Sequence, residues 1–128
     1  MSDYWSGIGT IQGNLQGVRE RKNAGAVEGM QLATLNTLNV SNSQVPHEDG
    51  DLERDGAASV EATRTGARGA VAYGRRADTK DYAVVQHEDM TLHHDSGRNA
   101  KFLENALNIT RAENAEILAQ RIRQKMGT

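Results

Sequence analysis

Apolar residues recur every three or four positions along the first third of the chain. One series is Ile8, Ile11, Leu15 and Val18, and after a polar interval the spacing resumes at Val27, Met30, Thr34 and Leu38. Such spacing predicts an amphipathic helix, either one long helix or two helices joined near residues 23–25. The helix should end by Val45, because a residue that precedes a proline, here Pro46, is disfavoured in the α conformation.

Glycines interrupt this helical pattern in two pairs, each spaced four residues apart: Gly13 with Gly17, and Gly25 with Gly29. A glycine inside a helix costs up to about 1 kcal/mol relative to alanine. The spacing places both members of a pair on one side of the helix, where the missing side chains let another backbone approach. Two alternatives stay open: close contact with a helix of this or a neighbouring subunit, and a loosely ordered helix that tolerates glycine.

Two segments in the middle of the chain have the composition of strands. They cover residues 58–63 and 67–73 and are separated by a turn-forming Thr-Gly pair at 65–66. This arrangement predicts a β-hairpin. Its inward-facing core candidates are Val60 and Val71.

A third apolar segment follows the hairpin, and a polar stretch comes after it. The segment contains Tyr82, Val84 and Val85 and predicts a strand or a short helix, with Tyr82 as a core candidate. Residues 86–97 are rich in histidine and acidic side chains. This composition predicts a structured loop.

The clearest periodic element lies in the last part of the chain. Its apolar stripe consists of Phe102, Leu103, Ala106, Leu107, Thr110, Ile117, Leu118, Ile122 and Met126. The stripe predicts an amphipathic helix with five core candidates: Phe102, Leu103, Leu107, Leu118 and Ile122. Thr110 and Glu113 have the spacing of a capping box, which signals a division into two helices near Asn108.

Composition narrows the picture to one small domain, residues 1–128. Only 37% of the residues are hydrophobic, with one Phe, one Trp and three Tyr, so the core needs aliphatic side chains and surface from neighbouring subunits. The absence of Cys excludes disulfides, thiolate zinc sites and a cysteine nucleophile. No apolar run approaches a membrane span and residues 1–7 lack the order of a signal peptide, so we expect a soluble protein that stays in the cytoplasm of the cell that makes it.

Charge is distributed unevenly along the chain. The net charge is -2, yet residues 98–128 carry six basic and three acidic side chains. The small negative total argues against nonspecific nucleic-acid binding as the main role. A negative body and a positive C-terminal segment would steer head-to-tail contact between copies. The positive interface candidates are Arg111, Arg121, Arg123 and Lys125.

A cluster of histidines and acids carries the remaining candidate chemistry. Such nitrogen and oxygen ligands can bind a divalent ion, so one alternative is a metal-dependent hydrolase that uses His87, His93, His94 and Asp95. The spacing does not match the zinc-protease motif, in which the second His follows the first by four residues. The favoured interpretation is a set of interface contacts by His87, Glu88, His93 and His94, with no metal and no catalytic group.

Two motifs flank the predicted strands in a fixed order. In the first, at residues 45–52, Gly50 and Leu52 follow Pro46. In the second, at residues 82–88, an aromatic-Ala pair leads to an acidic residue. After a loop, residues 100–107 open the C-terminal helix with the run Lys101, Phe102, Leu103 and Glu104.

In their order and spacing these motifs resemble the neck and tail-completion proteins of tailed bacteriophages, a family of small head-tail joining proteins. The resemblance implies an α+β fold in which a small antiparallel β-sheet is packed by a long N-terminal helix and a long C-terminal helix. It also implies a ring, with six copies favoured and twelve as the alternative. Because this is a structural family, the resemblance implies no catalytic residues and no cofactor.

The same resemblance implies a place in the virion neck, in a tail-completion or tail-terminator role, and in the host cytoplasm during assembly. The expected partners are other copies of the chain, adjoining neck and tail proteins, and genomic DNA that passes through the channel without sequence-specific binding; no membrane is expected. A free-standing α+β partner-binding module is a further alternative.

Overall fold

The computed structural model describes residues 2–44, 56–73, 81–88, 91–96 and 101–127. Its elements follow in the order α1 (Ser2–Gln44), β1 (Ala57–Thr63), β2 (Gly66–Tyr73), β3 (Asp81–Glu88), β4 (Thr91–Ser96) and α3 (Lys101–Met126). The predicted α+β class, with an antiparallel sheet and two long helices, is confirmed. The motif at residues 45–52 lies outside the described residues.

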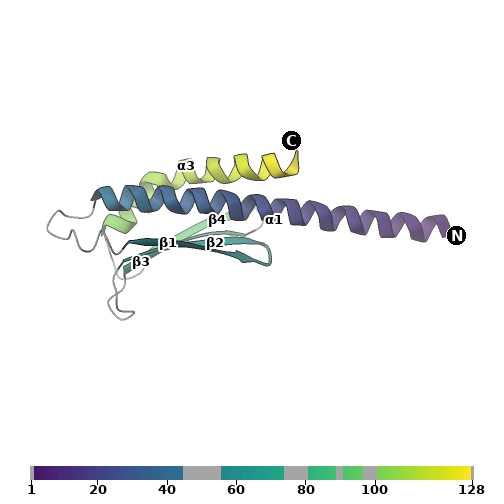
Figure 1. Ribbon diagram of the computed structural model, residues 1–128, viewed down its shortest axis with the longest axis horizontal. Coiled ribbons are helices and arrows are strands. Elements are labelled where there is room, and N and C mark those ends of the chain that lie inside the picture. The colour runs from purple at the N-terminus through teal and green to yellow at the C-terminus, as the bar shows by residue number, and fades with distance from the viewer. Residues whose placement is uncertain (1, 45–55, 74–80, 89–90, 97–100, 128) are drawn as a thin grey trace.

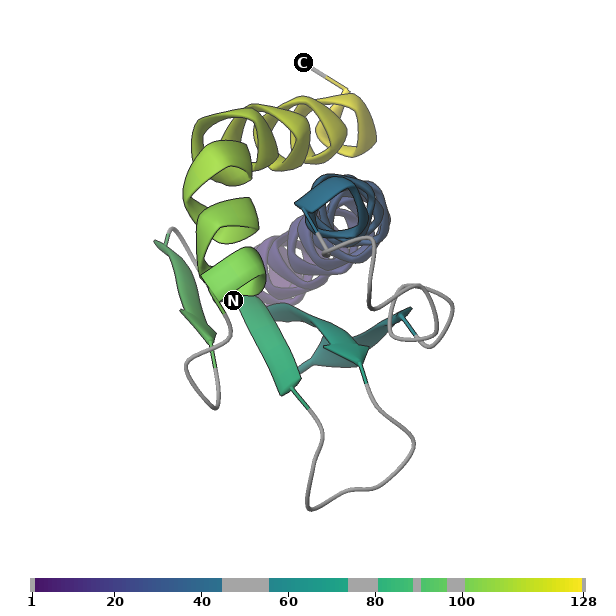
Figure 2. The same cartoon turned by 90° about the vertical axis from the view of Figure 1, so that its left-hand side faces the viewer.

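The four strands form one antiparallel sheet in the order β1-β2-β3-β4. The β1–β2 hairpin pairs Thr63 with Gly66, which confirms the predicted turn. Alternate residues of β2, among them Ala67, Val71 and Tyr73, are buried, because side chains alternate between the faces of a strand. Both helices lie on this one face of the sheet (Figure 2), so the core lies between the sheet and the helix layer.

Two predictions about the third strand and the segment after it are wrong. Tyr82 is 43% exposed and lies opposite Ala72, on the face that the helices do not cover. The period of two places Ala83, Val85 and His87 on the buried face instead. Residues 86–97 do not form a loop throughout, since β3 continues to Glu88 and β4 pairs with it.

The first helix is continuous from Ser2 to Gln44, which settles the choice between one helix and two. Its end agrees with the expected stop before Pro46. Figure 1 shows α3 running back along α1, while the N-terminal part of α1 extends beyond both α3 and the sheet. In Figure 2, α3 bends around α1 from the side of the sheet to the opposite side.

Glycines bring the two helices into close contact. An added Cβ at Gly25 would lie 2.7 Å from the Cα of Ile122, and one at Gly29 would lie 3.0 Å from the Cα of Leu118. The first alternative for this glycine pair, close helix contact, is therefore confirmed within the chain. The other pair differs, since an added Cβ at Gly13 would meet no atom of the described residues within 4 Å.

A polar cluster is buried between the helices next to this contact. Asn114 donates to the hydroxyls of Thr37 (3.0 Å) and Thr110 (3.2 Å), and the two hydroxyls are 3.1 Å apart. Thr110 also donates to the carbonyl of Ala106, one turn earlier in α3. The predicted division of this helix near Asn108 is wrong, because Thr110 bonds within a continuous helix and across to α1 instead of capping a new one.

Tyr73 of β2 contacts both helices at the far end of the core. Its hydroxyl is 2.6 Å from that of Ser41 and donates to the side chain of Asn42, while the ring of Phe102 meets its ring edge-on at a centroid distance of 5.2 Å. The core candidates fully buried are Val71, Leu103, Leu107 and Leu118. Three others are partly buried and pack against this core: Val60, Phe102 and Ile122.

The two glycine pairs predict opposite effects of the same substitution. Gly25→Ala should lower the free energy of unfolding by about 1 to 3 kcal/mol, because the methyl group overlaps the backbone of α3. Gly13→Ala should raise it by up to about 1 kcal/mol, because the site is open and alanine favours a helix. Urea denaturation of both variants tests this, and equal effects of the two substitutions would contradict the close contact.

Phe102→Ala should destabilise the fold by about 3 kcal/mol, the lower end of the range for a buried aromatic ring, because the ring is only partly buried. The variant loses the edge-on contact with Tyr73 and opens the start of α3. Thermal melting measures the loss. A shift indistinguishable from zero would mean that Phe102 does not anchor α3 to the sheet.

Candidate interaction surface

Three large apolar side chains lie uncovered on the projecting part of α1. Ile11 is 59% exposed, Leu15 61% and Val18 38%. Their spacing of four and three residues aligns them along one side of the helix, and we refer to them as the ridge. Isolated apolar residues are common on protein surfaces, but an aligned series on a projecting helix is a candidate contact surface.

The ridge continues the side of α1 that α3 covers. Positions 11, 15, 18, 22, 25 and 29 alternate steps of four and three residues, the spacing that keeps one helix face toward a partner helix. Gly25 and Gly29 at the end of this series contact α3. We call the side of α1 that faces α3 the seam. The ridge therefore lies on the seam, beyond the point where α3 ends.

The second apolar stripe of α1 faces the sheet instead. Val27 follows Val18 by nine residues, or about two and a half turns at 3.6 residues per turn, so the two series lie on opposite sides. Met30 is fully buried and Val27 and Leu38 pack against the core. The sequence pattern suggested one resumed stripe, whereas the structure has one stripe for the sheet and one for the seam.

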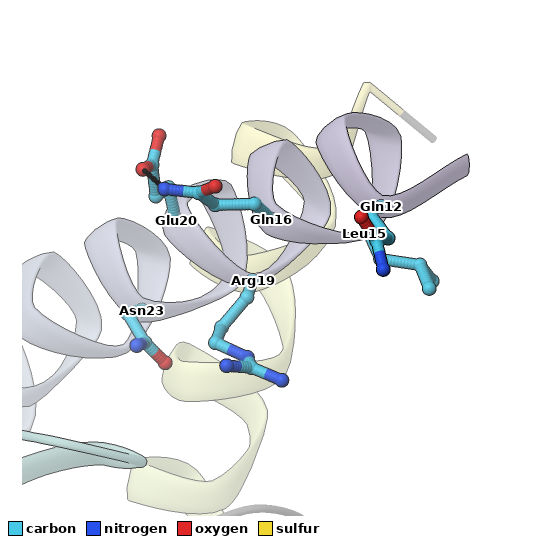
Figure 3. A pocket seen from close by; sticks show the side chains of 6 residues that line it. All are labelled: Gln12, Leu15, Gln16, Arg19, Glu20 and Asn23. Carbon is cyan, nitrogen blue, oxygen red and sulfur yellow. Dashed lines mark hydrogen bonds between the residues drawn. The ribbon is translucent and has the colours of Figure 1, made fainter. Parts of the chain in front are cut away.

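A shallow hollow of about 450 Å³ lies beside the ridge. The described residues that line it all belong to α1: Gln12, Leu15, Gln16, Arg19, Glu20 and Asn23. Figure 3 shows Leu15 extending away from the helix and Gln16 hydrogen-bonded to Glu20. Within the described part of the chain this hollow has one wall, which leaves room for a second molecule on the opposite side.

A cleft opens at the base of the projecting segment, between α1, α3 and the β3–β4 end of the sheet. It has a volume of about 320 Å³ and is lined by Lys22, His87, Leu92, Ala115, Leu118, Ala119, Ile122 and Arg123. Most of these side chains are aliphatic, and two of them, Lys22 and Arg123, are cationic. The cleft thus has an apolar lining, and the long stems of its cations can pack against an apolar guest while their charges stay in water.

Ion pairs hold the last turns of α3 against α1. Glu28 accepts from Arg121 at 2.9 Å and from Lys125 at 3.1 Å. The hydrogen bond from Lys125, helped by the charges of both cations, holds the pKa of Glu28 below its ordinary value, although partial desolvation opposes the shift. Arg121 and Lys125, expected to reach a neighbouring subunit, therefore bind within their own chain.

The other predicted interface residues are distributed over different surfaces. Arg111 is exposed on α3, and Arg123 lies at the cleft and pairs with Glu116 at 3.7 Å. His87 is only 8% exposed and lines the cleft. The side chains of Glu88 and His94 lie outside the described residues. An interface role for each of these residues remains a prediction.

The structure does not bring His87 and His93 together. His93 is exposed and lies opposite Gln86, one position from His87, so the two histidines occupy opposite faces of the sheet. Among the described residues, no group of three or more His, Cys, Asp or Glu side chains is placed to hold a metal ion. A site built on His87 and His93 jointly is therefore ruled out by the register.

The cleft could not be predicted from local patterns, because its lining residues come from four separate elements, α1, β3, β4 and α3. A weak signal was present in Ala115 and Ala119, two small residues one turn apart beside Leu118. No described helix has the length and apolar character needed to cross a bilayer. Comparison of the chain with family models, with curated proteins and with solved structures found no match.

Removing the Glu28 carboxylate should change the dependence of stability on pH. Because its folded pKa lies below the unfolded value, its stabilisation is complete above the unfolded value of about 4.3 and is lost as pH falls through the folded value. Glu28→Gln should therefore lower the melting temperature at neutral pH, and the difference from wild type should vanish in acid.

Glu113→Gln is the matched control, because it removes an equal charge from an exposed position on α3, the helix that packs against α1. Its melting temperature should stay close to that of wild type at neutral pH. A deficit for Glu28→Gln that persists unchanged into strong acid would show that the lost stability does not come from the ionised carboxylate.

Proposed function

We propose that this chain is a structural subunit of the neck of a tailed bacteriophage. Copies of it form a ring that joins the DNA-filled head to the tail, in a tail-completion or tail-terminator role, and the protein acts by binding alone. Six copies are the favoured number and twelve the alternative. Genomic DNA passes through the channel without sequence-specific contacts.

The observation that carries the proposal is the pairing of an uncovered apolar ridge with a separate, mostly apolar cleft on one small chain. Ile11, Leu15 and Val18 provide the first surface, and Leu92 and Ala119 are part of the second. Two unlike surfaces on every copy allow a heterologous contact, and such contacts close into rings when the rotation permits.

The thin core supports the same proposal. The side chains in the interior are mostly small, and several are polar, including Thr37, Thr110 and Asn114. A subunit of a ring can gain further apolar burial from its neighbours. The resemblance of the motifs at residues 45–52, 82–88 and 100–107 to neck proteins supports the specific location.

Native mass spectrometry of the purified chain tests the ring. We expect one closed oligomer, of six or twelve copies, at concentrations where assembly is complete. A chain that stays monomeric at every concentration tested, and also on purified heads or tails, would favour the free-standing binding module.

A second experiment tests the place in the virion, in a phage whose genome encodes this chain. Disrupting the reading frame should leave filled heads and separate tails, which negative-stain microscopy can count. Adding the purified wild-type chain to that lysate should restore joined particles, and buffer alone is the control. Joined particles at the wild-type yield without the protein would overturn the proposal.

A further inference from the structure

We infer that the ridge of one copy packs into the cleft of the next copy, and that this contact repeats around the ring. The inference deepens the proposed function, since it rests on a ring and names the two surfaces that form it. The ridge is Ile11, Leu15 and Val18, and the receiving residues are those of the cleft on α3 and the β3–β4 end of the sheet.

The position of the ridge on the seam of α1 indicates that it packs against a surface of another copy of this chain. Within the chain, the same seam at Gly25 and Gly29 is already covered by α3. The exposed positions 11, 15 and 18 continue that interface in the same heptad spacing. A contact from another copy would therefore extend an interface that the fold has already formed.

Charge favours this pairing over a contact with another face of the molecule. No charged residue lies between Asp3 and Arg19, so the ridge can leave water without burying an ion. The cleft presents Lys22 and Arg123 among its lining residues. The uncharged ridge can approach these cations without electrostatic repulsion. A face of the molecule that carries further cations, such as Arg111, would be repelled by them.

The position of the cleft makes a second copy the fitting partner. The ridge and the cleft adjoin along α1, because Lys22 follows Val18 by one turn and lines the cleft. Each chain thus carries both the donor and the acceptor surface, and every copy can give its ridge to one neighbour and receive another in its cleft. A ridge placed in the cleft of the next copy leaves one free ridge and one free cleft, so the contact repeats and closes into a ring when the rotation permits. In a two-fold dimer the two copies would exchange ridges, and a covalent ladder that ends at two copies would overturn the ring contact.

Cross-linking tests the contact directly, since the chain contains no Cys and introduced thiols are the only ones present. Leu15→Cys and Ala115→Cys are placed in one chain, the oligomer is treated with a short bifunctional maleimide, and denaturing gels are run. We expect a ladder of covalent species that ends at the ring size. The control is Leu15→Cys with Ser59→Cys, an exposed position on β1 away from the cleft, which should give no ladder.

Mixing single-cysteine chains separates a ridge-to-cleft contact from a ridge-to-ridge contact. Leu15→Cys mixed with Ala115→Cys should give covalent dimers, and neither chain alone should cross-link. Dimers from Leu15→Cys alone would mean that ridge pairs with ridge, which overturns the inference. In virions, a link from Leu15→Cys to a different neck protein in place of a second copy would also overturn it.

A charge placed on the ridge supplies an independent measurement. Leu15→Asp should leave the melting temperature of the subunit near that of wild type, because Leu15 is mostly exposed, and should raise the concentration needed for assembly at least about tenfold. Gly13→Asp adds the same charge on the other side of the helix, where an added Cβ meets no neighbour among the described residues within 4 Å, and should leave assembly unchanged.

The outcomes separate the inference from the proposed function. A ring by native mass spectrometry, with no link between positions 15 and 115 and normal assembly of Leu15→Asp, overturns the ridge-in-cleft contact and leaves the ring standing. Failure of the wild-type chain to assemble at all, on purified heads or tails as well as in solution, together with no cross-link in the chain that carries Leu15→Cys and Ala115→Cys, overturns the contact and the ring together.

Discussion

The close approach of α1 and α3 at Gly25 and Gly29 determines most of what this molecule presents to its surroundings. The two helices meet where an added Cβ would touch the backbone of Ile122 or Leu118. This contact fixes the line along which α3 runs over α1. It therefore also fixes where Thr37 meets Asn114, which side chains border the cleft, and how much of α1 remains beyond the last turn of α3.

Much of the fold could be predicted from local sequence signals. Pro46 marked the end of the first helix, the Thr-Gly pair marked the β1–β2 turn, and the stripe around Leu103 and Leu107 marked the last helix. These predictions succeeded because each depends on a few neighbouring residues. The fourth strand was missed because its side chains, which include His93 and His94, do not resemble those of a strand. An edge strand is held by backbone hydrogen bonds to one neighbour, and its side chains need not be apolar.

The candidate surface was harder to predict, because it depends on which faces of helices and strands that are far apart in the sequence turn toward one another. The spacing around Ile11 and Leu15 indicated a helix. Which apolar stripe meets the sheet depends on the step from Val18 to Val27, which places the two stripes half a turn apart. The pairing of Glu28 with Arg121 joins residues far apart in the sequence, so the charge count alone suggested that these cations contact a neighbouring copy. Tyr82 shows the same limit on a smaller scale, since a shift of one residue changes the face of the strand.

The magnitudes indicate which surface dominates assembly. Burial of a fully exposed aliphatic side chain contributes about 1.5 to 3 kcal/mol, and the ridge residues are one third to two thirds exposed, so each can still contribute about 1 kcal/mol. An exposed ion pair contributes about 0.2 to 1 kcal/mol, and three of the expected cations, Arg121, Arg123 and Lys125, are already paired within the chain. Apolar burial therefore outweighs charge at this contact. Association itself costs several kcal/mol, so a single ridge in a single cleft holds two copies weakly. In a closed ring each copy makes the contact twice, and a ring assembled on the end of a head or tail gains the stability that a pair of free copies lacks.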